Sequence, residues 1–171
     1  MVNEYLLVDG YNIIFAWDEL KKIADDSLDL ARDKLIGILK NYQGAKGFNI
    51  ILVFDAYLVK GNKGSVEKED NIYVVYTKEA ETADNYIEKT ATALSKYNKV
   101  RVATSDYLEQ VIIIGRGAVR ISAKDLKAEI EAVNREIKEH IEASKPVKKN
   151  MLFDNLDPKA AAWLEELRRK K

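Results

Sequence analysis

The chain of 171 residues contains no cysteine and only one histidine, His140. Without thiols it can form neither a disulfide nor a thiolate zinc site, and it lacks a cysteine nucleophile. A single imidazole cannot build a metal site of several histidines. Any metal site in this chain therefore has to use oxygen ligands, and the missing cysteine fits a reducing compartment.

Long hydrophobic runs and an excess of one charge are also missing. No stretch reaches transmembrane length, and the start, MVNEYLLVDGYN, lacks the basic segment and long apolar run of a signal peptide, so we expect a cytoplasmic protein. Lys plus Arg equals Asp plus Glu at 28 each, so the net charge of the chain does not indicate a nucleic-acid partner. Any basic surface has to be local.

What the sequence does contain is an alternation of short apolar runs and amphipathic stretches. The apolar runs predict strands within 5–8, 49–55, 72–76, 99–106 and 118–122. The amphipathic stretches predict helices over 25–43, 82–97, 106–117, 122–144 and 157–171. This order predicts an α/β fold, a three-layer sandwich with a mostly parallel central sheet and extra C-terminal helices.

Two features of this organisation are less regular. Residues 61–70 (GNKGSVEKED) are polar, contain glycine and show no periodicity, so we expect a loop and leave the topology between the second and third strands open. Residues 1–144 are expected to form one domain. A basic linker and a C-terminal helix, residues 145–171, are expected to pack on or near it.

Acidic residues end three of the five predicted strands: Asp9, Asp55 and Asp106. A fourth acid, Asp84, lies in the first turn of the helix that follows the third strand, and Glu81 precedes it by three residues. In a parallel sheet the carboxyl ends of the strands meet at one edge, where such folds bind ligands. We therefore expect the ends of the first, second and fourth strands to lie near one another.

These acids have two explanations. Each one alone is better explained as a helix cap or turn residue. Several together would repel one another, so that their pKa values rise or a cation binds. Carboxylates without histidine or cysteine suit Mg²⁺ or Mn²⁺, which can acidify a water molecule and neutralise a phosphoryl group. We prefer the metal site as the hypothesis.

Small polar residues accompany the acids. Asn12 follows Asp9 by three residues and can bind a ligand or fix a carboxylate. Thr104 and Ser105 could donate to a phosphate or to Asp106, but TSD is equally a good capping sequence between a strand and a helix. Both explanations stay open for Thr104 and Ser105.

Four motifs, LLVDGYNII, ILVFDA, ETADNYI and VATSD, occur in this order. Together they resemble the NYN domain family, and within it the bacterial YacP-like proteins, over nearly the whole chain. NYN domains are similar to PIN-domain nucleases. The resemblance implies a PIN-like fold and a metal-dependent endoribonuclease, a hydrolase that associates with ribosomes, cuts mRNA during translation and so takes part in mRNA decay.

The resemblance also implies roles for single residues. Asp9, Asp84 and Asp106 fall on the family's acids and Asn12 on its asparagine, which makes these four the catalytic candidates. The metal candidates are Asp9, Asp55, Asp84 and Asp106, which would hold one or two Mg²⁺ or Mn²⁺ ions. Glu81, Thr104 and Ser105 are auxiliary. No organic cofactor and no membrane partner is expected.

An endoribonuclease also needs groups that bind RNA. The candidates are cations and aromatic residues near the strand-end acids: Arg116, Tyr57, Tyr107, Lys60 and Lys63. The alternative for the cations is an ordinary solvated surface.

Other functions fit less well or differ in class. A catalytically silent RNA- or ribosome-binding module of the same fold is the main alternative. A receiver domain would need an acid pair after the first strand and a lysine after the last, and both are missing. A phosphatase of the haloacid dehalogenase type would need a second aspartate at the position of Tyr11.

Overall fold

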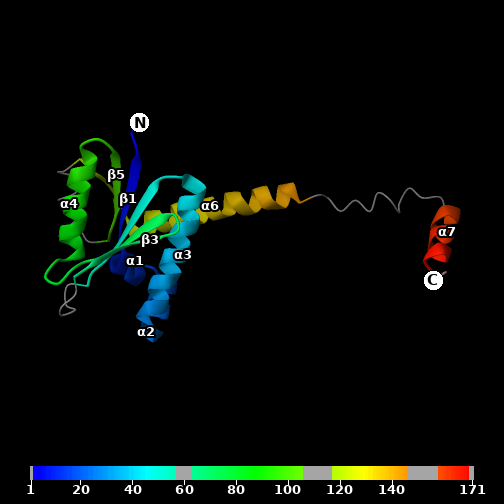
Figure 1. Ribbon diagram of the computed structural model, residues 1–171, viewed down its shortest axis with the longest axis horizontal. Helices are drawn as coiled ribbons and strands as arrows, with labels where there is room; N and C mark the ends of the chain where they lie inside the picture. Colours follow the sequence, from blue (N-terminus) through cyan, green and yellow to red (C-terminus); the bar gives the residue numbers. More distant parts are fainter. Residues whose placement is uncertain (1, 57–62, 106–116, 146–157, 170–171) are drawn as a thin grey trace. The chain divides into compact units, whose positions relative to one another are not determined.

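The computed structural model of the chain describes residues 2–56, 63–105, 117–145 and 158–169 (Figure 1). Its contacts divide the chain into two compact units, residues 1–133 and 134–171. The first unit contains a six-stranded sheet. The second contains the end of helix α6 and helix α7. The domain boundary expected after residue 144 stays a prediction.

The strands are β1 (Glu4–Asp9), β2 (Asn49–Phe54), β3 (Ser65–Glu69), β4 (Ile72–Tyr76), β5 (Lys99–Ala103) and β6 (Val119–Ile121). The helices are α1 (Gly10–Ala16), α2 (Asp18–Asp26), α3 (Leu28–Lys46), α4 (Ala83–Ser95), α6 (Ala123–Ser144) and α7 (Pro158–Arg169). Among the described residues, no helix has both the length and the apolar character needed to cross a membrane.

The sheet has the order β3-β4-β2-β1-β5-β6. All neighbouring strands run parallel except β3 and β4, which pair antiparallel. The predicted α/β class with a mostly parallel sheet is therefore confirmed. Strands β2, β1 and β5 are adjacent, so the ends of the first, second and fourth predicted strands do share one edge.

Helices cover both faces of this sheet, with α4 on one side and α3 on the other (Figure 1). Because side chains alternate along a strand, Leu6 and Val8 pack toward α1, α3 and the first part of α6, while Leu7 packs toward α4. Trp17 is buried, and its Nε1 donates to the Ala123 carbonyl at 2.8 Å.

Residues 10–26 form two short helices that the sequence analysis did not predict. The Asp9 side chain caps α1, and Trp17 adopts an extended conformation that separates α1 from α2. The overlooked signal is helical spacing in Ile13, Trp17 and Leu20, all of which are buried.

The loop expected over 61–70 was wrong for its second half, because Ser65–Glu69 is the edge strand β3. It turns into β4 through Asp70, whose φ is 53°. Charged residues suit an exposed strand edge, and they hide the alternation that would otherwise predict a strand.

The C-terminal expectations have mixed outcomes. The long helix at 122–144 is confirmed as α6, and Ser122 caps it by accepting from the Asp125 amide at 3.0 Å. The last helix begins at Pro158, at the start of the stretch 157–171 that was expected to be helical. The helix expected over 106–117 falls almost wholly on 106–116, which lies outside the described residues.

Candidate functional site

The pleat of β1 directs Asp9 toward the α4 side of the sheet, since it lies two residues after Leu7. Its side chain is only 5% exposed, and it sits level with Val53 of β2. Asp55 follows Val53 by two residues and so extends from the same face just beyond β2. The alternation of side chains therefore puts both carboxyl groups at the carboxyl edge, next to the start of α4.

Asn12 holds Asp9 in place. Its backbone amide donates to Asp9 Oδ1 at 3.4 Å, and its side-chain Nδ2 donates to Oδ2 at 3.0 Å. The hydroxyl of Ser105, just after β5, donates in turn to Asn12 Oδ1. The amide thus fixes a carboxylate, which is one of the two roles that the sequence left open, and a chain of hydrogen bonds joins β5 to β1.

The environment of Asp9 raises its pKa above the ordinary value. Burial is the main cause, because it disfavours the charged carboxylate. The hydrogen bonds from Asn12 lower the pKa in part, and the negative charges of Asp84 and Asp55 raise it further. A cation would therefore stabilise the charged form of Asp9, which is buried and is repelled by two other carboxylates.

Asp55 and Asp84 meet at the start of α4. The amide of Ala83 donates to Asp55 Oδ2 at 3.3 Å, so Asp55 does bind the end of a helix, as the capping explanation requires. The residue at the N-cap position itself is Thr82, whose hydroxyl accepts from the Asn85 amide at 3.2 Å. Asp84 is exposed in the first turn. Asp55 therefore has two effects: it accepts a hydrogen bond from the start of α4, and its negative charge raises the pKa of Asp9.

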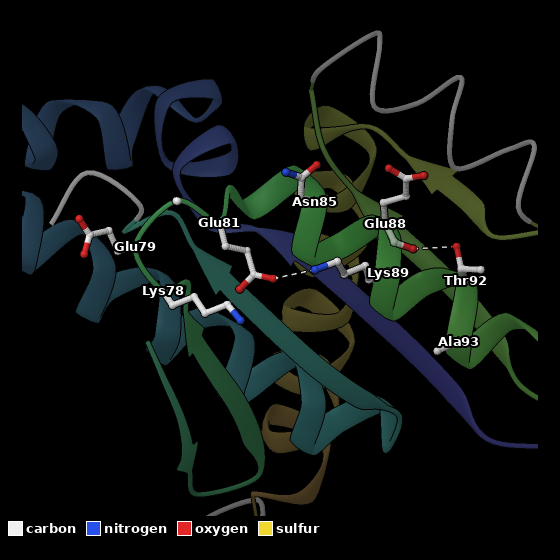
Figure 2. A pocket seen from close by; sticks show the side chains of 9 residues that line it. Lys78, Glu79, Glu81, Asn85, Glu88, Lys89, Thr92 and Ala93 are labelled. Atoms are coloured by element: carbon white, nitrogen blue, oxygen red, sulfur yellow. Dashed lines mark hydrogen bonds and ion pairs between the residues drawn. The ribbon is translucent and has the colours of Figure 1, made fainter. Parts of the chain in front are cut away.

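Glu81 is engaged elsewhere. It makes an ion pair with Lys89 Nζ at 3.2 Å, and its side chain is 15% exposed (Figure 2). This contact ties the segment before α4 to the second turn of the helix. The geometry gives Glu81 a structural contact of its own, while its auxiliary role stays a prediction.

Two threonines follow strands β4 and β5, which flank the strands β2 and β1 that lead to Asp55 and Asp9. Thr104 follows β5 and is fully buried, and its amide donates to the Ile121 carbonyl at 3.3 Å. Thr77 follows β4, is 1% exposed, and its hydroxyl accepts from the Ala56 amide at 2.9 Å. Thr77 thereby fixes the chain next to Asp55. Thr77 was not predicted from the sequence, although it occupies the same strand-end position as the acids.

Several predicted site residues fall outside the described part of the chain: Asp106, Tyr57, Lys60, Tyr107 and Arg116. Lys63 is described and exposed. Within the described ranges no three Asp, Glu or His side chains are grouped closely enough to hold a metal ion. The Asp9 side chain nevertheless fits Mg²⁺ or Mn²⁺, because it offers only oxygen ligands. Its carboxyl group is buried and has a raised pKa, so a cation would stabilise its charged form.

Comparisons with known proteins agree with this architecture. The family model of the YacP-like NYN domain matches residues 6–169. A Bacillus subtilis (strain 168) protein named uncharacterized protein YacP is 43% identical over 166 residues, which cover 94% of this chain and 96% of that protein.

Two crystal structures are also similar to this chain. The structure of Rae1 (YacP) from Bacillus subtilis has 42% identity and a TM-score of 0.69, and the match covers 97% of this chain and 95% of that one. A single-site mutant of Rae1 (YacP) matches with 42% identity and a TM-score of 0.71, over 84% and 86% of the two chains.

Proposed function

Because the chain belongs to the YacP-like NYN domain family, which has a nuclease-type fold, we propose that it is a metal-dependent endoribonuclease. Its substrate would be mRNA, cut in association with the translating ribosome in the cytoplasm, as the resemblance implies. The observation that supports this most is Asp9, a buried carboxylate at the carboxyl edge whose pKa is raised by burial and by Asp84 and Asp55.

The proposed metal ligands are Asp9, Asp84 and Asp106, with Asp55 as a further ligand or support. When bound there, Mg²⁺ or Mn²⁺ would supply an activated water for in-line attack on the phosphodiester and neutralise charge on the leaving oxygen.

Three other residues would hold these carboxylates in position. Asn12 orients the Asp9 carboxylate, and Ser105 fixes the Asn12 amide. Thr77 holds the segment that carries Asp55. Each of these contacts restricts where a carboxylate oxygen can lie, which a metal site requires.

RNA contacts are proposed for Lys60, Lys63 and Arg116 through phosphates, and for Tyr57 and Tyr107 through stacking on unpaired bases. Of these, Lys63 is exposed beside a hollow that Lys78 and Tyr86 also line.

A catalytically silent RNA- or ribosome-binding module remains the second candidate. The observation in its favour is that no three acids are grouped within the described ranges. The two candidates differ in one result. Asp84→Asn should abolish metal-dependent cutting if the protein is an endoribonuclease, whereas a binding module would have no cutting to lose.

The test of the main proposal is cleavage mapping during translation, with the wild type and Asp9→Asn side by side. We expect Asp9→Asn to fold normally and to lose cleavage by more than about a hundredfold, beyond the effect of losing a residue that only supports a ligand. Asp70→Asn is the matched control, since Asp70 lies in the turn between β3 and β4 and pairs with Lys40. Cleavage by Asp9→Asn at the wild-type rate would contradict the proposal.

A further inference from the structure

Two of the surface hollows near the carboxyl edge differ in charge. The first, of about 740 Å³, lies beside α4 and contains three acids, Glu79, Glu81 and Glu88, and two cations, Lys78 and Lys89 (Figure 2). One of these cations is already paired, because Lys89 binds Glu81. This hollow therefore has a net negative charge and would repel an RNA backbone.

The second hollow, of about 420 Å³, lies between the junction of α1 and α2, the end of β5 and the start of α6. Three cations line it, Arg120, Lys124 and Lys127, against a single acid, Asp18. Its net charge is positive. The start of the long helix α6 adds the positive end of a helix dipole to the same place.

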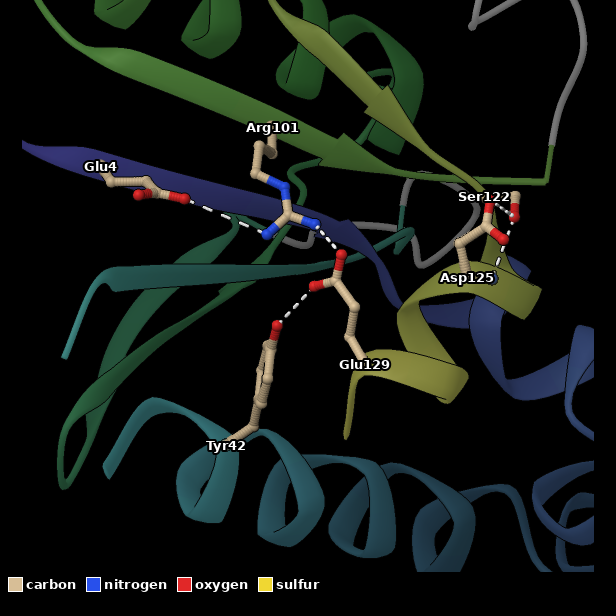
Figure 3. A network of polar contacts seen from close by, with 6 residues as sticks. All are labelled: Glu4, Tyr42, Arg101, Ser122, Asp125 and Glu129. Atoms are coloured by element: carbon tan, nitrogen blue, oxygen red, sulfur yellow. Dashed lines mark hydrogen bonds and ion pairs between the residues drawn. The ribbon is translucent and has the colours of Figure 1, made fainter. Parts of the chain in front are cut away.

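Two of the three cations are available for a ligand. Arg120 and Lys124 are exposed, and neither makes an ion pair within the described residues. Lys127 pairs with Glu19 at 3.3 Å. The hydroxyl of Ser122, which also lines this hollow, is engaged by Asp125 at 2.6 Å (Figure 3). The free positive charge is thus concentrated on Arg120 and Lys124.

The second hollow adjoins the proposed reaction site. Ser105 lines it and donates to the Asn12 side chain, which in turn donates to Asp9. Two hydrogen bonds therefore separate the hollow from the buried carboxylate. Trp17, which also lines the hollow, is buried, and its Nε1 donates to the Ala123 carbonyl, so this part of the lining is held in place.

We propose that this second hollow binds a backbone phosphate of the RNA strand next to the bond that is cut, with Arg120 and Lys124 as the phosphate ligands. The strand then leaves the acidic edge toward α6 rather than along α4. The inference rests on the proposed function for its substrate, and it adds a binding site and a direction. The planar fork of Arg120 suits two phosphate oxygens, and Lys124 supplies a point charge.

The test is the affinity for a fluorescent single-stranded RNA, measured in EDTA over a series of salt concentrations. For Arg120→Gln/Lys124→Gln we expect binding to weaken about tenfold and the salt slope to fall by about one, since one phosphate loses its cations. Arg120→Lys/Lys124→Arg keeps both charges and should restore most of the affinity. Both side chains are exposed, so an unchanged thermal midpoint serves as the check on folding.

The matched control is Lys78→Gln/Lys89→Gln, which removes the same number of charges from the first hollow. We expect its affinity to stay within about twofold of the wild type, because at physiological salt charges act over only about 8 Å. Unchanged binding by Arg120→Gln/Lys124→Gln would overturn the inference. An equal loss in the control would also overturn it.

Cleavage of the same RNA with Mn²⁺ separates this inference from the proposed function. If the wild type does not cut but Arg120→Gln/Lys124→Gln binds more weakly, the phosphate site stands and the nuclease proposal fails. If the wild type cuts and the double variant binds and cuts like it, the nuclease proposal stands and the phosphate site fails.

Discussion

At the scale of single residues, Asp9 is the feature that most needs an explanation. Its raised pKa means that the folded protein binds a proton there more tightly than the unfolded chain does. The stability from this proton is fully present below the ordinary pKa of 3.8 and is lost as the pH rises through the raised value in the folded state. Once ionised, Asp9 therefore destabilises the fold, and a bound cation would offset that cost.

The contact between Asn12 and Asp9 leads to a prediction about pH. Asn12→Ala removes the side-chain hydrogen bond from Nδ2, which lowers the pKa of Asp9, and keeps the bond from the backbone amide, so this pKa should rise further. Because a metal competes with the proton, the pH at which Mn²⁺ binding is half lost should move upward. The affinity near neutral pH should fall about 10- to 100-fold. Thermal-shift titration with Mn²⁺ over a pH series measures both effects.

Asn71→Ala is the control for this experiment. Asn71 lies in the turn before β4, where its amide donates to the Lys40 carbonyl at 3.0 Å, away from the acids. Its Mn²⁺ titration should match the wild type at every pH. An Asn12→Ala profile that overlays the wild type would remove the positioning role from Asn12.

The sequence could predict that Asn12 can fix the carboxylate of Asp9, because the two residue types and their spacing belong to one short motif. It could not predict Thr77, which has no motif of its own. Its importance comes from a hydrogen bond to Ala56, across two strands that are distant in sequence. Contacts of this kind depend on strand order, which composition and periodicity do not determine.

At the scale of elements, the start of α1 lies unusually close to β2. A Cβ atom added at Gly10 would come within 2.4 Å of the Phe54 ring and 3.0 Å of the Val53 carbonyl oxygen. This close approach explains why a glycine directly follows Asp9. It also means that packing at Gly10 sets the direction from which α1 leaves the strand and thus where Asn12 meets Asp9.

Gly10→Ala is therefore expected to destabilise the protein by about 1–3 kcal/mol through overpacking. Gly37→Ala is the matched control, because nothing lies within 4 Å of the added Cβ on helix α3. It should stabilise by about 0.4–1 kcal/mol, since alanine restricts the unfolded chain more than glycine does. Urea denaturation of the two variants tests the pair, and equal effects would contradict the packing argument.

A polar network joins α6 to the sheet and to α3 (Figure 3). Glu129 accepts from Arg101 Nη2 of β5 at 2.7 Å and from the Tyr42 hydroxyl of α3 at 2.7 Å. Burial, together with Glu129, raises the pKa of Tyr42 to about 12. Burial tends to raise the pKa of Glu129, but the hydrogen bonds from Arg101 and Tyr42 outweigh it, and the pKa is lowered.

Glu129→Gln should lower the free energy of unfolding at pH 7, because it removes the charge that Arg101 and Tyr42 bind. The loss should be only about 1 kcal/mol, since the side chain is partly exposed. A lowered carboxyl pKa gives stability that is present above the ordinary value of 4.5 and is lost as the pH falls through the lower value in the folded state. The difference between variant and wild type should shrink over that range. Denaturation at several pH values measures it, with Glu131→Gln, an exposed change on the same helix, as control. A constant difference would exclude the charge as its cause.

Elements differed in how far the sequence could predict them. The buried strands were predicted because each is a short apolar run, and α6 because it has a clear helical period of hydrophobic residues. Strand β3 was missed because an edge strand needs few apolar residues, and Val66 is 64% exposed even in the fold. Helices α1 and α2 were missed because each is short, and packing against α3 rather than length stabilises them.

At the scale of the whole sheet, strand order assembles the site. Asp9 and Asp55 are 46 positions apart in the sequence, yet β1 and β2 are neighbours. The alternation of strands and helices predicted this meeting of strand ends. It did not predict that β3 and β4 form a hairpin at the sheet edge, because nothing in residues 61–70 fixes the direction of the chain.

The most direct test of the central claim is a crystal of the protein soaked in Mn²⁺ and measured for anomalous scattering. The account predicts a peak within about 2.5 Å of carboxylate oxygens of Asp9 and Asp84, lost in Asp9→Asn crystals. At saturating Mn²⁺, a map with no peak at the carboxyl edge, or with peaks only at other acids, would contradict it.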